Sequence, residues 1–149
     1  MGNKSMENGG VEYLQMIQGI IDRMSTSSAV FKGFTATIVA GISALSFADT
    51  NKWVLLLSFV PILCFTYLDT YYLQLERRYR ALFDQVRLGK HPINFDLEPL
   101  KNKDILKANK HAQIGFVSCL FSRSIIWFYF PLAIISVIVI TLKFGGWLS

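Results

Sequence analysis

Three long stretches without any charged residue constrain this chain more than any other feature. They contain 16, 16 and 19 residues and lie at 33–48, 53–68 and 124–142. A helix rises about 1.5 Å per residue and the apolar core of a bilayer is about 30 Å thick, so a membrane span needs about 20 residues. The third stretch meets this length almost alone, and apolar or aromatic flanks lengthen the other two. We therefore expect an all-α membrane protein with three transmembrane helices.

Composition agrees with this reading. The chain has 149 residues, of which 52% are hydrophobic and 17% are charged. A disordered chain needs low hydrophobicity and high charge, and about 25% of the residues of an ordinary soluble domain are charged. Both classes are therefore disfavoured, and the length suits one domain at most.

The predicted organisation follows from the apolar stretches and the polar segments between them. We expect a flexible N-terminus, an amphipathic helix, a transmembrane hairpin, a helical and loop region, a third transmembrane helix and a short tail, at 1–10, 11–27, 29–72, 73–123, 124–144 and 145–149. A turn at 48–52 is short enough to make the first two spans antiparallel neighbours. Six residues are expected at the membrane boundaries, where amphipathic side chains gather: Lys32, Trp53, Asp69, Tyr71, Trp127 and Trp147. Lys32 and Asp69 fall at one level of this hairpin, so we expect a structural salt bridge between them.

The basic residues predict an orientation. Ten of the 15 Lys and Arg residues fall within 71–124, three within 1–32, and one each in the 48–52 turn and the C-terminal tail. Basic residues accumulate in cytoplasmic segments. We therefore expect a membrane protein with a cytoplasmic N-terminus and an external C-terminus.

An amphipathic helix is indicated at 11–24, where apolar residues recur every three or four positions. Its polar face carries a single Arg, whereas helices that lie on membranes are usually rich in Lys and Arg. Docking on the other cytoplasmic helices is therefore favoured over lying on the membrane surface. The segment Ser25–Ser28 is expected to end this helix and to cap the next one.

The second helix is expected to run from Trp53 to Leu88 and to project well beyond the bilayer before Gly89 and Pro92 stop it. The projecting part carries an apolar stripe that needs covering: Tyr72, Leu75, Tyr79, Leu82, Phe83 and Val86. We expect other copies of the chain to cover this stripe, so the stripe is the predicted interface of a homo-oligomer.

Arginines lie on the other side of the same projecting helix. The predicted basic surface consists of Arg77, Arg78, Arg80 and Arg87, with ion pairs expected from Arg80 to Glu76 and to Asp84. A solvated face is the simplest interpretation, and membrane lipids, anionic ones included, are the alternative partner. No nucleic-acid partner is expected, because excess positive charge beside a membrane follows from topology.

The first span contains a ladder of small residues, which allows two helix backbones to approach closely: Gly33, Ala36, Ala40, Gly41 and Ala44. The ladder is expected to pack either within the hairpin or against a neighbouring copy. Thr35, Thr37 and Ser43 leave an oligomeric pore open as a further reading.

The remaining segments predict structure rather than chemistry. His91–Leu100 has two prolines and alternating apolar residues, which indicates an extended, ordered loop with a short edge strand as an option. Ser124 is the expected N-cap of the third span. The two histidines, His91 and His111, have no Cys or carboxylate at ligand spacing, and no phosphate-binding or hydrolase motif occurs. We therefore expect no enzyme, no cofactor and no metal.

Three segments together resemble a known family: 12–24, 68–77 and 126–132. They are similar to the RipA-like family of small bacterial inner-membrane proteins, and the resemblance covers about residues 11–143. It implies an octamer and a link to bacterial adaptation and stress, without a defined biochemical activity.

Two functions are therefore weighed. The first is a non-enzymatic homo-oligomer that acts as a scaffold or stress-sensing assembly with a cytoplasmic helical collar. The second is a membrane-permeabilising effector or channel, for example in phage defence. A subunit of a larger complex with other chains is a more remote reading.

Overall fold

The structure is a computed structural model. It describes the backbone of residues 2–45, 52–101, 103–105 and 114–145, and the side chains of these ranges except those of residues 2–8 and 52. Trp147, His111 and most of the 48–52 turn lie outside the described residues.

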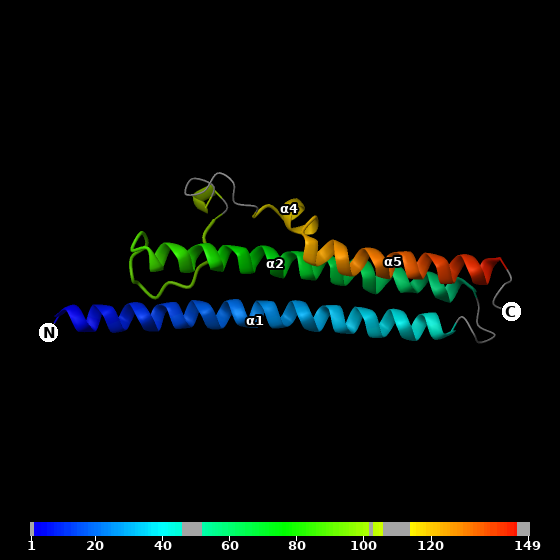
Figure 1. Ribbon diagram of the computed structural model, residues 1–149, viewed down its shortest axis with the longest axis horizontal. Helices are drawn as coiled ribbons and strands as arrows, with labels where there is room; N and C mark the ends of the chain where they lie inside the picture. Colours follow the sequence, from blue (N-terminus) through cyan, green and yellow to red (C-terminus); the bar gives the residue numbers. More distant parts are fainter. Residues whose placement is uncertain (1, 46–51, 102, 106–113, 146–149) are drawn as a thin grey trace.

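The described part of the chain is helical and contains no strand. Its elements are α1 (Gly2–Ala44), a 3-10 helix η2 (Lys52–Ser58), α2 (Phe59–Arg87), α4 (Phe116–Leu120) and α5 (Arg123–Phe144). α1, α2 and α5 lie lengthwise beside one another, with α4 at the junction where α5 begins (Figure 1). Three segments are long and apolar enough to cross a membrane: Gly9–Ala44, Trp53–Arg87 and Arg123–Phe144. The prediction of an all-helical chain with three such helices is confirmed.

α1 is one uninterrupted helix of 43 residues. The expected helix end at Ser25–Ser28 is therefore wrong, and the helix already includes residues 2–10, which were expected to form a flexible N-terminus. The hydroxyls of Thr26 and Ser27 donate to the carbonyl oxygens of Asp22 and Arg23, both at 2.9 Å. Ser and Thr can satisfy the carbonyl four residues back instead of capping a new helix, and this lets α1 continue.

The second long helix begins later than predicted. The segment Lys52–Ser58 is a 3-10 helix, and α2 starts at Phe59. Pro61 explains the change, because its ring clashes with the carbonyl four residues earlier and it has no N–H to donate. Proline is tolerated in a first helical turn, and Pro61 is the third residue of α2.

Helix ends elsewhere follow local chemistry. α2 stops where predicted, with Gly89 in the left-handed region at a φ of +66°, the conformation that glycine adopts after many helices. α5 starts at Arg123, so its N-cap is Ser122 and not the expected Ser124. The loop at 91–100 is extended without forming the optional strand.

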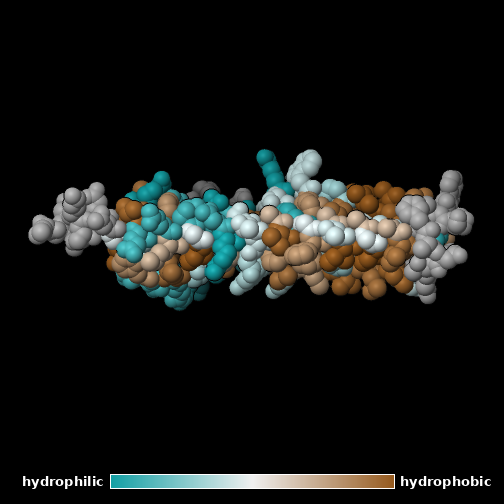
Figure 2. Space-filling model, turned by 90° about the horizontal axis from the view of Figure 1, so that it is seen from below, coloured by the Kyte–Doolittle hydropathy of each residue, from teal (hydrophilic) through white to brown (hydrophobic). Residues whose placement is uncertain are grey.

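The molecule has two chemically distinct halves (Figure 2). The polar half comprises residues 9–27 and 73–101, and the apolar half comprises residues 29–45, 53–72 and 123–145. Each half has its own cluster of buried residues. The polar-half core contains Tyr13, Ile17, Ile21, Tyr79, Leu82 and Val86, and the apolar-half core contains Val39, Ile62, Ile125 and Tyr129. Many apolar side chains of the apolar half are exposed, as expected for helices that meet lipid.

Candidate functional site in the helical bundle

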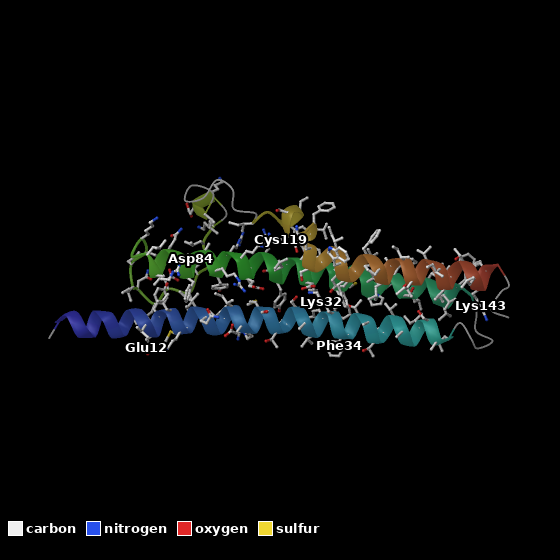
Figure 3. All side chains as sticks on the ribbon, viewed as in Figure 1. Glu12, Lys32, Phe34, Asp84, Cys119 and Lys143 are labelled. Atoms are coloured by element: carbon white, nitrogen blue, oxygen red, sulfur yellow. The ribbon has the colours of Figure 1, made fainter. Side chains whose placement is uncertain are left out.

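The most unusual chemical feature of the structure is a buried ion pair between α1 and α2. The ammonium Nζ of Lys32 lies 2.6 Å from Oδ2 of Asp69, and the Asp69 side chain is fully buried. Lys32 points from α1 toward α2, whereas Phe34, two residues later, points away from it (Figure 3). The predicted salt bridge is confirmed.

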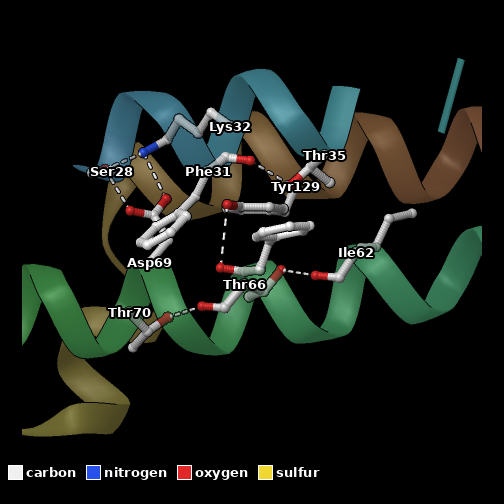
Figure 4. Close-up of polar contacts among 10 residues, drawn as sticks. Ser28, Phe31, Lys32, Thr35, Ile62, Thr66, Asp69, Thr70 and Tyr129 are labelled. Carbon is white, nitrogen blue, oxygen red and sulfur yellow. Dashed lines mark hydrogen bonds and ion pairs between the residues drawn. The ribbon is translucent and has the colours of Figure 1, made fainter. Parts of the chain in front are cut away.

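Ser28 closes this pair into a ring of three polar groups. Nζ of Lys32 donates to Oγ of Ser28 at 2.7 Å, and the Ser28 hydroxyl donates to Oδ1 of Asp69 (Figure 4). Ser28 and Lys32 are four residues apart, so both project from one face of α1. Each carboxylate oxygen therefore has its own partner, which is what a buried charge requires.

Other hydroxyls around the pair are satisfied separately. The Thr35 hydroxyl donates to the carbonyl oxygen of Phe31 at 2.7 Å, and the Tyr129 hydroxyl donates to that of Phe65 at 3.3 Å. Thr66 and Thr70 likewise donate to carbonyls four residues earlier. Tyr129 thus ties α5 to α2 one turn away from Asp69, and the cluster joins all three long helices.

Lys32 and Asp69 lie near the end of the apolar half that adjoins the polar half, because the apolar half begins at residue 29 on α1 and ends at residue 72 on α2. Tyr129, which reaches α2 one turn from Asp69, is six residues after the start of α5. The position of Lys32 and Asp69 at a membrane boundary stays a prediction. Ionisable residues inside a membrane span are costly and usually face the interior of the helix bundle, as this pair does.

The cluster is a neutral ring that two hydrogen bonds and one ion pair close. It holds one carboxylate, and the described residues contain no group of three His, Cys, Asp or Glu side chains that could hold a metal ion. The arrangement suits fixing the relative position of α1 and α2. Ser28, Thr35 and Tyr129 were not singled out for this site; the position of Ser28 four residues before Lys32 was the only available signal.

The apolar stripe of α2 is not a free surface. Leu82 is fully buried, and Tyr79 and Val86 are nearly so, all against Tyr13, Ile17 and Ile21 of α1. Leu75 and Phe83 pack on the same core and Tyr72 contacts Phe31, with ring centres 5.2 Å apart. Tyr79, Leu82 and Val86 therefore need no other copy to cover them, because α1 and the loop at 91–100 do so within one chain. Tyr72, Leu75 and Phe83 are half-buried, and their place in an interface between copies stays a prediction.

The small residues of α1 have the opposite outcome. Gly33, Ala40, Gly41 and Ala44 are exposed and Ala36 is half-buried. A Cβ atom placed on Gly33 or Gly41 would find nothing within 4 Å. The option that this ladder packs within the hairpin is therefore wrong.

The basic surface is partly neutralised within the chain. Arg80 binds Glu76 at 2.7 Å, as predicted, whereas Asp84 pairs with Arg87 at 3.1 Å and not with Arg80. Burial raises the pKa of the Cys119 thiol, and the nearby charge and hydrogen bond of Arg77 oppose that rise. Arg77 and Arg78 also have partners of their own.

Of the side chains predicted at membrane boundaries, Trp53, Tyr71 and Trp127 are exposed. The Trp53 ring meets that of Phe144 edge-on at 5.9 Å, which joins η2 to the end of α5.

Comparison of the chain with protein-family models, curated proteins and solved structures finds no match.

Proposed function

We propose that this protein is a non-enzymatic, homo-oligomeric protein of the bacterial inner membrane that acts as a scaffold or stress-sensing assembly. The three apolar helices support the membrane location, and the concentration of basic residues in 71–124 supports a cytoplasmic N-terminus. The resemblance to the RipA-like family supports an assembly of eight copies.

One observation carries the assembly: the outward face of α1, defined as Gly19, Thr26, Gly33, Thr37, Gly41 and Ala44. All six are exposed. Because successive residues turn by about 100° around a helix, they share the side opposite the buried Ile17, Ile21, Thr35 and Val39. This face spans 25 residue steps, or about 38 Å of helix.

The composition of this face favours another helix over lipid. Glycine in a helix interior costs about 1 kcal/mol relative to alanine, so three glycines on one face weaken α1 unless they serve a contact. Lipid tails are as apolar as leucine, so helices associate in membranes through close packing, which small residues permit. Gly33, Thr37 and Gly41 have the spacing of four that such contacts use. A second copy of α1 is the occupant that this face fits.

The test is the mass of the assembly in lipid nanodiscs, measured by native mass spectrometry. Gly41→Leu should break a multi-copy parent into smaller species, because its side chain would separate the helices. Cys64→Leu places the same side chain at an exposed position of α2 and should leave the mass unchanged. A parent that is already a monomer, or a Gly41→Leu variant with the parental mass, would refute the proposal.

A membrane-permeabilising channel is the second candidate. It is favoured by the exposed Thr37, whose hydroxyl donates to the carbonyl oxygen of Gly33 at 2.9 Å, and by the exposed glycines Gly33 and Gly41, which add polar groups to the outward face of α1. If α1 helices surround an axis, these groups line it. Leakage of a dye from liposomes that hold the purified protein tests this function, and retention of the dye under osmotic, voltage and pH steps would exclude it.

A further inference from the structure

The two cores described above are joined on α1 by a segment that buries little. No residue between Ile21 and Thr35 is fully buried. The Ser28–Lys32–Asp69 ring anchors the far end of that segment. The polar-half part of α1 is therefore held by contacts of its own, separate from those of the apolar half.

The extended loop at 91–100, called the strap below, supplies much of that hold. The Tyr13 hydroxyl of α1 donates to the carbonyl oxygen of Asp96, and the Tyr79 hydroxyl of α2 donates to that of Leu97 at 3.1 Å. The hydroxyls of two tyrosines, one from each helix, thus donate hydrogen bonds to adjacent carbonyl oxygens of the strap. Leu97 and Leu100 also pack on the polar-half core.

Phe95 is the residue of the strap that lies against α1. Its φ is +55°, a region that bulky residues avoid. Its ring, although 45% exposed, lies 5.5 Å from that of Tyr13, and its Cζ atom lies 3.8 Å from where a Cβ atom of Gly9 would stand. The contact with α1 and the local hydrogen bond from the Asp96 N–H to Oδ1 of Asn94 together offset the cost of this backbone conformation.

A pair of glycines makes room for the strap. A Cβ atom on Gly10 would lie 3.3 Å from Cδ1 of Ile93, closer than an ordinary contact. Glycine weakens a helix interior, so Gly9 and Gly10 leave this end of α1 dependent on the strap for its position.

The segment between the two anchors is suited to bending. Thr26 and Ser27 hydrogen-bond to the carbonyls of Asp22 and Arg23, and such bonds compete with the helix's own ladder and often bend helices. A helix with an anchor on each side of such a segment can pivot there if one anchor opens.

We propose that the strap is a latch: it holds residues 9–22 of α1 on α2, and its release lets that part of α1 pivot at Ser25–Ser28 while the apolar half stays docked. In a sensing assembly, residues 9–22 of α1 would be the part that moves. The latch does not depend on whether the chain forms an oligomer.

Hydrogen exchange of backbone amides tests the latch in the full-length protein. Tyr13→Phe removes one hydroxyl and Phe95→Ala removes the seated ring, and each should speed exchange within residues 11–21 about tenfold. Exchange within residues 35–43 should not change. Met16→Ala, at an exposed position of the same stretch, is the matched control and should leave the Tyr13 region as slow as in the parent.

A locked variant provides the converse measurement. Gly10→Cys with Ile93→Cys, in a chain whose Cys64 and Cys119 are replaced by alanine, should slow exchange of residues 11–21 when oxidised and restore it when reduced. Faster exchange that extends equally over residues 35–43 would show one rigid unit and overturn the latch. Unchanged exchange in both Tyr13→Phe and Phe95→Ala would overturn it as well. The mass of the assembly, measured on the same samples, separates this result from the oligomer proposal.

Discussion

Lys32 and Asp69 form a 2.6 Å ion pair inside the apolar half of the bundle, with the carboxylate fully buried and the ammonium group largely so. A buried pair is weak evidence for net stability, but removing one partner leaves an uncompensated charge. Moving α1 away from α2 would separate these two charges at a cost in free energy, so the pair holds the two helices together.

Asp69→Leu or Lys32→Met alone should destabilise the protein by about 3–5 kcal/mol, the usual effect of breaking a buried pair. The double variant should recover most of that loss, because both charges disappear together. Reversible unfolding in mixed micelles, followed by circular dichroism, measures the three free energies. Equal losses from the single and double variants would contradict a paired role.

The latch should weaken at high pH. Burial, followed by the charge of Asp96, raises the pKa of Tyr13 above its ordinary value of 10.0. The neutral tyrosine is therefore favoured when the strap is closed, and its stabilising contribution is complete below pH 10 and lost as pH rises through the raised pKa. The slope of the free energy of unfolding against pH above 10, followed by circular dichroism in mixed micelles, should lose the contribution of this group in Tyr13→Phe. A slope that persists in that variant would assign the effect to another group.

Gly19→Ala should stabilise a single chain, dispersed in micelles, by about 1 kcal/mol, because alanine is the better helix former and a Cβ atom at Gly19 meets nothing within 4 Å in that chain. Gly10→Ala should gain less or lose, because its Cβ atom would press on Ile93. Comparison of the two unfolding free energies isolates the strap contact. A larger gain for Gly10→Ala would mean that the strap does not restrict that position.

The sequence predicted those features that follow from the positions of charged residues and from the lengths of the apolar stretches. The three apolar helices and the Lys32–Asp69 pair follow from where charges stop and from antiparallel neighbours. It did not predict that α1 continues through Ser25–Ser28, because the same hydroxyls can either cap a helix or bond to a carbonyl four residues back. The assignment of Tyr79, Leu82 and Val86 to an interface failed for a different reason: the strap that covers them is held by contacts distant in sequence, from Tyr13 to Asp96.

The position of the small residues was also ambiguous. A pattern of Gly33, Thr37 and Gly41 shows that something approaches closely, but only the arrangement of the helices shows that α2 lies on the other side of α1. That result moves the proposed contact between copies from α2 to α1.

The most direct measurement of this contact is the distance between spin labels on different copies, by pulsed electron resonance in nanodiscs. The label is placed at Phe34→Cys, an exposed position beside the outward face rather than within it, in a chain whose Cys64 and Cys119 are replaced by alanine. Packing through the outward face brings two α1 axes to about 8–10 Å, so labels at position 34 should lie closer together than labels at Leu63→Cys, an exposed site of α2. No dipolar signal between copies, or a shorter distance at position 63 than at position 34, would contradict the account.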